Sequence, residues 1–140
     1  MTVIESLREY IKLFPGVEGG KINVDFLPEE AQTYSVDVIP SNEIVKRYID
    51  GSSIRQFLFV FASRGFYGPE IRQQLDNVGF YEEFSEWINT NSQKGIFPSL
   101  DGGREPRKIE ITTSGYAFAL GEDTARYQIQ GRLEYFQPAE

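Results

Sequence analysis

Three acidic residues, Glu82, Glu83 and Glu86, lie close together in the sequence, and carboxylates at such spacing can bind a metal ion or transfer protons. On a helix the same spacing turns them away from the apolar residues Phe84 and Ile88, toward solvent. We therefore interpret the three carboxylates as the solvated face of an amphipathic helix.

The chain contains no cysteine and no histidine. This composition removes disulfides, zinc sites with Cys or His ligands, thiol nucleophiles and every Ser-His arrangement. Ser114 accordingly has no imidazole base beside it. Gly102 and Gly103 precede Arg104 without the spacing of a phosphate-binding loop. We expect no catalytic residues, no metal site and no cofactor, and therefore no enzyme.

The remaining candidates for contacts are basic and aromatic. Arg104, Arg107 and Lys108 form a basic cluster that we expect to pair with acidic groups, in this chain or in another copy. Phe66 and Tyr67 follow a strongly apolar run and lie next to glycines. They are candidates either for an exposed contact or for a lid over the domain's own core.

The 140 residues suffice for one domain, which we assign to residues 1–140. The formal net charge is −7, which argues against a general nucleic-acid binder because binding to DNA requires an excess of basic residues. No apolar run approaches the roughly 20 residues that span a bilayer, and no signal peptide is evident. We expect a soluble protein of the cytoplasm.

A hairpin is predicted to organise the fold. Its arms are residues 44–49 and 53–62, and Asp50-Gly51-Ser52 forms the turn, because Asp-Gly tolerates the positive φ of a tight hairpin. The second arm carries five consecutive apolar residues, 57–61, of which the three phenylalanines are most simply core. Both faces of such a strand must be covered, which indicates a central position in the sheet.

The other predicted elements surround this hairpin. We expect a helix over residues 2–13 with Thr2 and Glu5 as a capping box, and strands near residues 22–26 and 34–38. A helical region over 69–88, split or bent at Gly79, precedes a long loop over 91–107.

A second hairpin runs out through residues 108–113, turns at 121–123 and returns through 127–135. The predicted fold class is α+β, a mainly antiparallel sheet of about five to six strands with helices packed on one face.

The last predicted strand has one polar face, formed by Arg126, Gln128, Gln130, Arg132 and Glu134. Such a row indicates a surface that meets water or a hydrated partner.

Five segments show a pattern seen together in a known family. They are residues 6–11 (Ser-Leu-Arg-Glu-Tyr-Ile), 22–27 (Ile-Asn-Val-Asp-Phe-Leu), 34–40 (Tyr-Ser-Val-Asp-Val-Ile-Pro), 48–59 (Tyr-Ile-Asp-Gly-Ser-Ser-Ile-Arg-Gln-Phe-Leu-Phe) and 125–130 (Ala-Arg-Tyr-Gln-Ile-Gln). Over residues 6–136 the chain resembles small tail proteins of phages and prophages of Gram-positive bacteria, called minor capsid proteins or tail terminators. These shared segments are structural rather than catalytic.

The resemblance implies a role in virion assembly. Tail terminators are α+β subunits that form a hexameric ring at the head-proximal end of the tail tube, where they stop tube growth and present a surface to the head. The implied partners are copies of the same chain, the tail tube protein and head–tail connector proteins. The implied locations are the bacterial host cytoplasm during assembly and then the virion tail.

A closed ring requires contacts between different surfaces of neighbouring subunits, which suits loops and sheet edges. On this basis the residues expected at subunit interfaces are Phe66, Tyr67, Phe97, Arg104, Arg107, Arg126 and Arg132. We expect no sequence-specific binding of nucleic acid and no membrane association. An acidic subunit would also avoid adhering to DNA that passes through the ring.

Other functions stay open at the level of the sequence. The chain could be another head–tail connector or completion protein, or a module that binds a small molecule or carbohydrate through its many tyrosines. An enzyme that uses only carboxylates and tyrosines ranks last, because no pair of carboxylates stands out.

Overall fold

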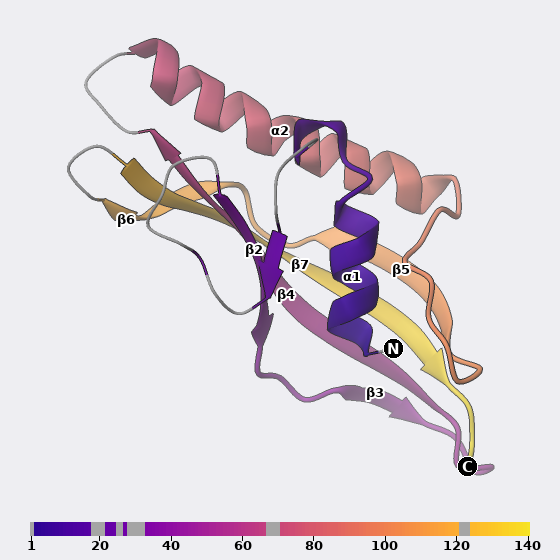
Figure 1. Ribbon diagram of the computed structural model, residues 1–140. Helices are drawn as coiled ribbons and strands as arrows, with labels where there is room; N and C mark the ends of the chain where they lie inside the picture. Colours follow the sequence, from indigo (N-terminus) through magenta and orange to yellow (C-terminus); the bar gives the residue numbers. More distant parts are fainter. Residues whose placement is uncertain (1, 18–21, 25–26, 28–32, 67–70, 121–123) are drawn as a thin grey trace.

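The computed structural model describes residues 2–17, 22–24, 27, 33–66, 71–120 and 124–140. Its elements in chain order are α1 (Val3–Ile11), the 3₁₀ turn η1 (Pro15–Val17), β1 (Ile22–Val24), β2 (Thr33–Ile39), β3 (Ile44–Arg47), β4 (Ser53–Phe66), α2 (Ile71–Gln93), β5 (Glu105–Ile111), β6 (Tyr116–Leu120) and β7 (Thr124–Gln137). Figure 1 shows both helices on the same side of a strongly twisted sheet.

The described strands form one sheet of seven, in the order β1-β2-β4-β7-β5, with β3 added to β4 and β6 to β7. β1 pairs with β2 in parallel, and every other pairing is antiparallel. The predicted α+β class with a mainly antiparallel sheet is therefore confirmed. The strand count exceeds the expected five to six because the outgoing arm of the last hairpin divides into β5 and β6, which both pair with β7.

The predicted central strand is confirmed in β4. This strand pairs with β7 from Ser53 to Phe66 and with β2 on its other edge. It continues beyond the expected end at residue 62 because β7, also 14 residues long, supplies hydrogen-bond partners along its whole length. The hairpin with β3 also forms, with a bulge between Ile44 and Lys46.

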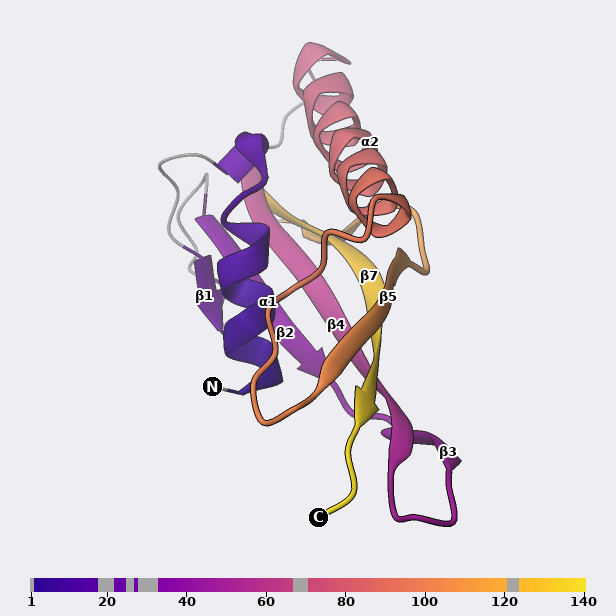
Figure 2. The ribbon, with the colours of Figure 1, turned by 90° about the vertical axis from the view of Figure 1, so that its right-hand side faces the viewer.

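The hydrophobic core lies between this sheet and the two helices (Figure 2). Phe59 and Phe61 of β4 are fully buried, and the Phe61 ring lies 4.5 Å from that of Phe84 in α2. The helices also meet each other, since the Tyr10 and Trp87 ring centroids are 5.1 Å apart. Offset or tilted aromatic pairs at such distances add to the free energy of apolar burial.

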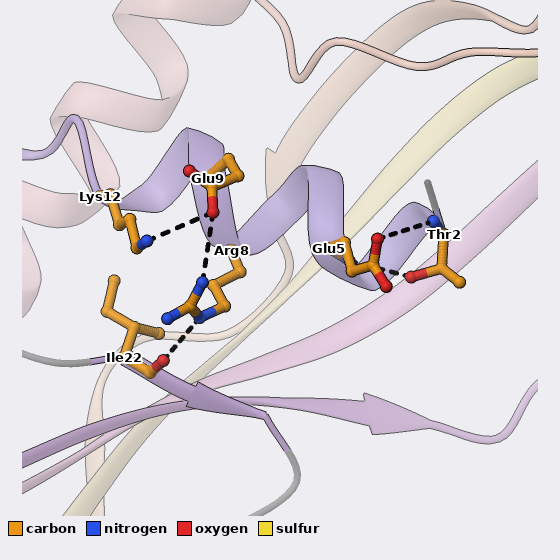
Figure 3. A network of polar contacts seen from close by, with 6 residues as sticks. All are labelled: Thr2, Glu5, Arg8, Glu9, Lys12 and Ile22. Carbon is orange, nitrogen blue, oxygen red and sulfur yellow. Dashed lines mark hydrogen bonds and ion pairs between the residues drawn. The ribbon is translucent and has the colours of Figure 1, made fainter.

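Helix α1 begins as the sequence predicts (Figure 3). The Glu5 backbone N–H donates to Thr2 Oγ1 at 3.2 Å, and the Thr2 N–H donates to the Glu5 carboxylate at 3.3 Å, which completes the capping box. The Arg8 side chain donates to the Ile22 carbonyl at 2.7 Å and so joins the helix to β1. The helix ends at Ile11, two residues before its expected end.

The prediction for the second helical region was wrong in two respects. α2 is one continuous helix through Gly79, and it extends to Gln93. The following loop therefore covers residues 94–104 rather than 91–107, since β5 already begins at Glu105. One glycine costs a helix only about 1 kcal/mol, and burial of Tyr81, Phe84 and Ile88 directly after it outweighs that cost.

A polar contact lies inside this core. The Tyr81 hydroxyl donates to the Tyr127 carbonyl oxygen at 2.8 Å, so the Ser63 hydroxyl, 2.6 Å away, donates to Tyr81. Burial raises the pKa of the Tyr81 phenol, because the apolar surroundings disfavour the phenolate.

We expect Tyr81→Phe to lower the free energy of unfolding by about 1–3 kcal/mol, because Ser63 and the Tyr127 carbonyl lose a buried partner. The pKa of Tyr81 is higher in the folded state than in the unfolded state. The contribution of the neutral phenol to stability is therefore fully present below the unfolded-state pKa of about 10, and it is lost as the pH rises further. Urea unfolding of the variant should therefore depend less on pH above about 10 than that of the wild type. Tyr48→Phe, at an exposed position, is the control.

Two glycines offer a matched test of the packing. A Cβ on Gly131 of β7 would lie 2.5 Å from the Phe59 ring and 3.0 Å from the Glu110 carbonyl, whereas one on Gly79 of α2 would meet nothing within 4 Å. We expect Gly131→Ala to destabilise the fold by about 1–3 kcal/mol through overpacking. Gly79→Ala should stabilise it by about 0.5–1 kcal/mol. Equal effects in chemical denaturation would contradict this assignment.

Candidate functional site

The side of the sheet opposite the helices carries polar side chains on β2, β5, β6 and β7 and at Gln56 of β4, with the apolar Leu58, Val60 and Ala62 of β4 between β2 and β7. The polar side chains are here called the polar face. Because successive residues of a strand point to opposite sides, the buried residues Tyr127, Ile129 and Leu133 of β7 leave its even-numbered residues on this other side. The polar face consists of Asp37, Gln56, Glu110, Tyr116, Arg126, Gln128, Gln130, Arg132 and Glu134.

One half of the polar face is centred on Arg126. Its guanidinium forms an ion pair with Asp37 of β2 at 2.8 Å, and both side chains are only 20% exposed. Its Nε also donates to the Gln128 side chain at 3.0 Å. Gln128 in turn donates to the Tyr116 hydroxyl at 2.7 Å, and Ser35 hydrogen-bonds Asp37. The network thus links β2, β6 and β7.

Arg132 is the centre of the other half. Its guanidinium donates to Gln56 at 2.8 Å, to Glu110 at 3.3 Å and to Glu134 at 3.1 Å. One arginine therefore holds side chains from β4, β5 and β7. Each of the three guanidinium nitrogens donates to a side chain of this chain, and Glu110 and Glu134 balance the charge, so this arginine contributes to a fixed pattern of charge and is not a free cation awaiting an anionic ligand.

The network gives the polar face a mixed charge. Its negative charges are those of Asp37, Glu110 and Glu134, and its positive charges are those of Arg126 and Arg132. Nucleic-acid binding requires an uncompensated basic surface, which these residues do not form. A pre-ordered array of donors and acceptors suits recognition of a polar, hydrated protein surface, where bridging water molecules are common.

Arg126 and Arg132, expected at interfaces, lie on the polar face and pair with acidic residues of this same chain. Arg104 also pairs internally, with the carboxylate and backbone carbonyl of Asp101 at 2.6 and 2.9 Å. The Arg107 guanidinium lies 5.6 Å from the ring centroid of Phe136, a cation–π contact. Their participation in subunit contacts stays a prediction.

The aromatic residues expected at subunit interfaces are Phe66, Tyr67 and Phe97, and the structure describes the side chain of Phe97 alone. Phe97 is partly buried against the hydrophobic core, so at least part of its surface serves the fold. The backbone of Phe66 forms the last pair of β4 with Thr124 of β7, but its side chain lies outside the described residues, as does all of Tyr67. The described candidates, Phe97 against the core and the arginines at other positions, thus do not form one cluster.

The sequence analysis missed a surface at the far end of the sheet. There β3, the following turn and the start of β4 extend beyond the helices; we call residues 44–55 the hairpin arm (Figures 1 and 2). Val45 is 50% exposed, Tyr48 42% and Ile49 fully exposed at 107%. The sequence did contain a signal for this exposed surface. Ile49 directly precedes the Asp50-Gly51 turn, and an apolar side chain at such a position lies too far from the core to be buried in it.

The tip of the hairpin arm is well ordered by its own contacts. The Asp50 carboxylate accepts hydrogen bonds from the backbone N–H and the hydroxyl of Ser52 at 2.9 and 2.5 Å, and these bonds lower the pKa of Asp50. The Tyr48 N–H donates to the Ser52 carbonyl at 2.9 Å, and Gly51 has φ +92°. Ile49 is therefore presented in a fixed position.

A hollow of about 320 Å³ lies between the middle of α2 and the β5–β6 connection. We call it the α2 hollow; its lining residues are Tyr81, Glu82, Ser85, Glu86, Ser114, Gly115 and Ile129. Glu82, Glu83 and Glu86 are exposed, which confirms the predicted solvated helix face. A smaller groove of about 140 Å³ lies beside α1, where Leu13 is 69% exposed.

Within the part of the chain that the structure describes, no group of acidic, histidine or cysteine residues has the geometry of a metal site. In the same residues no helix combines the length and apolar character needed to cross a bilayer.

No protein-family model matches the sequence, and a comparison with curated proteins gives no match.

The Arg126–Asp37 pair can be measured by a double-mutant cycle with Arg126→Ala and Asp37→Ala. We expect a coupling free energy of about 0.5–3 kcal/mol, because both groups are largely shielded from water. The control is the exposed Glu9–Lys12 pair, with side chains 56% and 38% exposed, for which about 0–1 kcal/mol is expected. If urea unfolding gives equal coupling free energies for the two pairs, the Arg126–Asp37 pair contributes no more to stability than an exposed pair does. That result would show that the polar face does not order the sheet.

Proposed function

We propose that this protein is a structural virion-assembly protein of a long-tailed phage or prophage, acting as a tail terminator. In this role several copies form a ring at the head-proximal end of the tail tube, end its growth and join it to the head. The resemblance of five segments to minor tail proteins supports the proposal, together with an α+β fold that presents two distinct surfaces.

The observation that carries the proposal is the hairpin arm. Val45, Tyr48 and Ile49 expose apolar surface next to one another on this arm, and the backbone of its turn is fixed by hydrogen bonds. Burial of the Ile49 side chain in a contact with another subunit would contribute about 1.5–3 kcal/mol to that contact. An arm that extends beyond the body of the sheet suits contacts between different surfaces of neighbouring copies, and such contacts form a ring where the rotation from one copy to the next closes.

The polar face supplies a second kind of contact in this proposal. Its internally paired arginines and carboxylates favour a hydrated and specific interface, as expected for docking onto the tail tube protein or a connector. A non-enzymatic role agrees with a chain that has no histidine or cysteine. The protein would accumulate in the host cytoplasm and then become part of the tail.

The test is electron microscopy of particles from a phage or prophage in which this coding sequence is deleted. We expect overlong tails without heads beside normal filled heads, because tube growth is no longer stopped. The control is the same strain with the wild-type sequence supplied on a plasmid, which should restore normal particles.

Two other results would change the proposal. Tails of normal length that fail to join heads would assign the protein to head–tail connection. Unchanged infectious particles would overturn an assembly role, and ligand-induced thermal stabilisation would then test a small-molecule or carbohydrate-binding function.

A further inference from the structure

The hairpin arm differs in charge from the rest of the chain. Lys46 and Arg47, both exposed, lie between Val45 and Tyr48, and the Lys46 ammonium is 5.2 Å from the centroid of the Tyr48 ring. The chain as a whole has a net charge of −7. Residues 44–55 hold three basic residues, Lys46, Arg47 and Arg55, and one acidic residue, Asp50, so the arm has a net charge of +2. It presents the apolar Ile49 side chain and fits a receptor that is hollow and acidic at its edge.

The α2 hollow has these properties. Tyr81 and Ile129, which are 4% and 1% exposed, belong to its lining, and the exposed Glu82 and Glu86 lie at it, one helical turn apart on the same side of α2. The groove beside α1 fits less well, because its single carboxylate, Glu9, is already paired with Arg8 and Lys12.

The two surfaces lie far apart along the sheet. Figures 1 and 2 show β3 and its turn at one end of the molecule, whereas Ile129 of the hollow pairs with Phe61, eight positions along β4 from Ser53 at the start of that strand. Eight residues of strand span roughly 26 Å, so an arm cannot reach the hollow of its own chain. A contact between them must join two copies. Because it uses different surfaces on the two partners, it leaves one arm and one hollow free for further copies, and it closes only as a ring.

We propose that the hairpin arm of one copy binds in the α2 hollow of the next, with Ile49 inserted and with the positively charged arm beside Glu82 and Glu86. This contact deepens the proposed ring-forming role and rests on it for the expectation of a closed ring. A hairpin tip buries a small area compared with stable interfaces, so two free copies associate weakly and the contact is best detected by covalent trapping.

The absence of cysteine in the chain permits a clean disulfide test. Ile49→Cys chains are mixed with Ser114→Cys chains, both at exposed positions, under mild oxidation with copper phenanthroline. We expect the mixed disulfide to form several-fold faster than in the matched control, Ile49→Cys with Leu13→Cys, which tests the groove beside α1. Unchanged circular dichroism and melting of each variant establish that the fold is retained.

The other outcomes overturn the proposal. Preferential coupling to Leu13→Cys would place the arm in the groove beside α1, and rapid coupling of Ile49→Cys to itself would indicate a symmetric dimer joined at the tips. Equal and slow coupling in all mixtures would mean that the arm does not bind a second copy.

Charge reversal provides an independent measurement of the same contact. Adding K46E/R47E to the Ile49→Cys chain should slow its coupling to the Ser114→Cys chain, and adding E82K/E86K to the latter should restore it. No change in rate would remove the electrostatic part of the proposal.

The contact and the proposed function can fail separately. Deletion particles with overlong tails but no mixed disulfide would keep the terminator role and reject this contact. A specific disulfide together with fully infectious deletion particles would keep the contact and reject the role.

Discussion

The pairing of β4 with β7 is the constraint on which the rest of the structure depends. Fourteen consecutive residues of each strand face each other in unbroken antiparallel register. Since side chains alternate along a strand, this single register decides that Phe59, Phe61, Ile129 and Leu133 meet the helices, while Arg126 and Arg132 meet the opposite side. A shift by one residue would exchange the core and the polar face.

The features that depend on neighbouring residues could be predicted from the sequence. The capping box of α1 involves residues three positions apart, and the Asp-Gly turn between β3 and β4 is equally local. The aromatic run in β4 requires cover on both sides wherever it lies, so its central place was also predictable. These features are sufficient to establish the α+β class.

The features that depend on distant partners could not be predicted in this way. Arg126 pairs with Asp37, 89 positions away, and only the sheet order brings β2 within reach of that side chain. The continuity of α2 through Gly79 is decided by packing against the sheet rather than by local helix propensity. The break between β5 and β6 likewise follows from how both strands fit along β7. The apolar residue type of Ile49 predicts a position in a strand. In the structure Ile49 lies in the turn, where its side chain packs against no other part of the described chain.

The bulge in β3 has a consequence for how the sheet edges of separate copies can meet. In the described part of the sheet β3 pairs with β4 alone, so its other edge is open to a further strand. The bulge between Ile44 and Lys46 interrupts the regular spacing of backbone donors along that edge, and Lys46 and Arg47 bring positive charge to it. Pairing of β3 edges between copies, and with it strand-by-strand growth into fibres, is thereby disfavoured on the same arm that exposes the apolar Ile49 side chain.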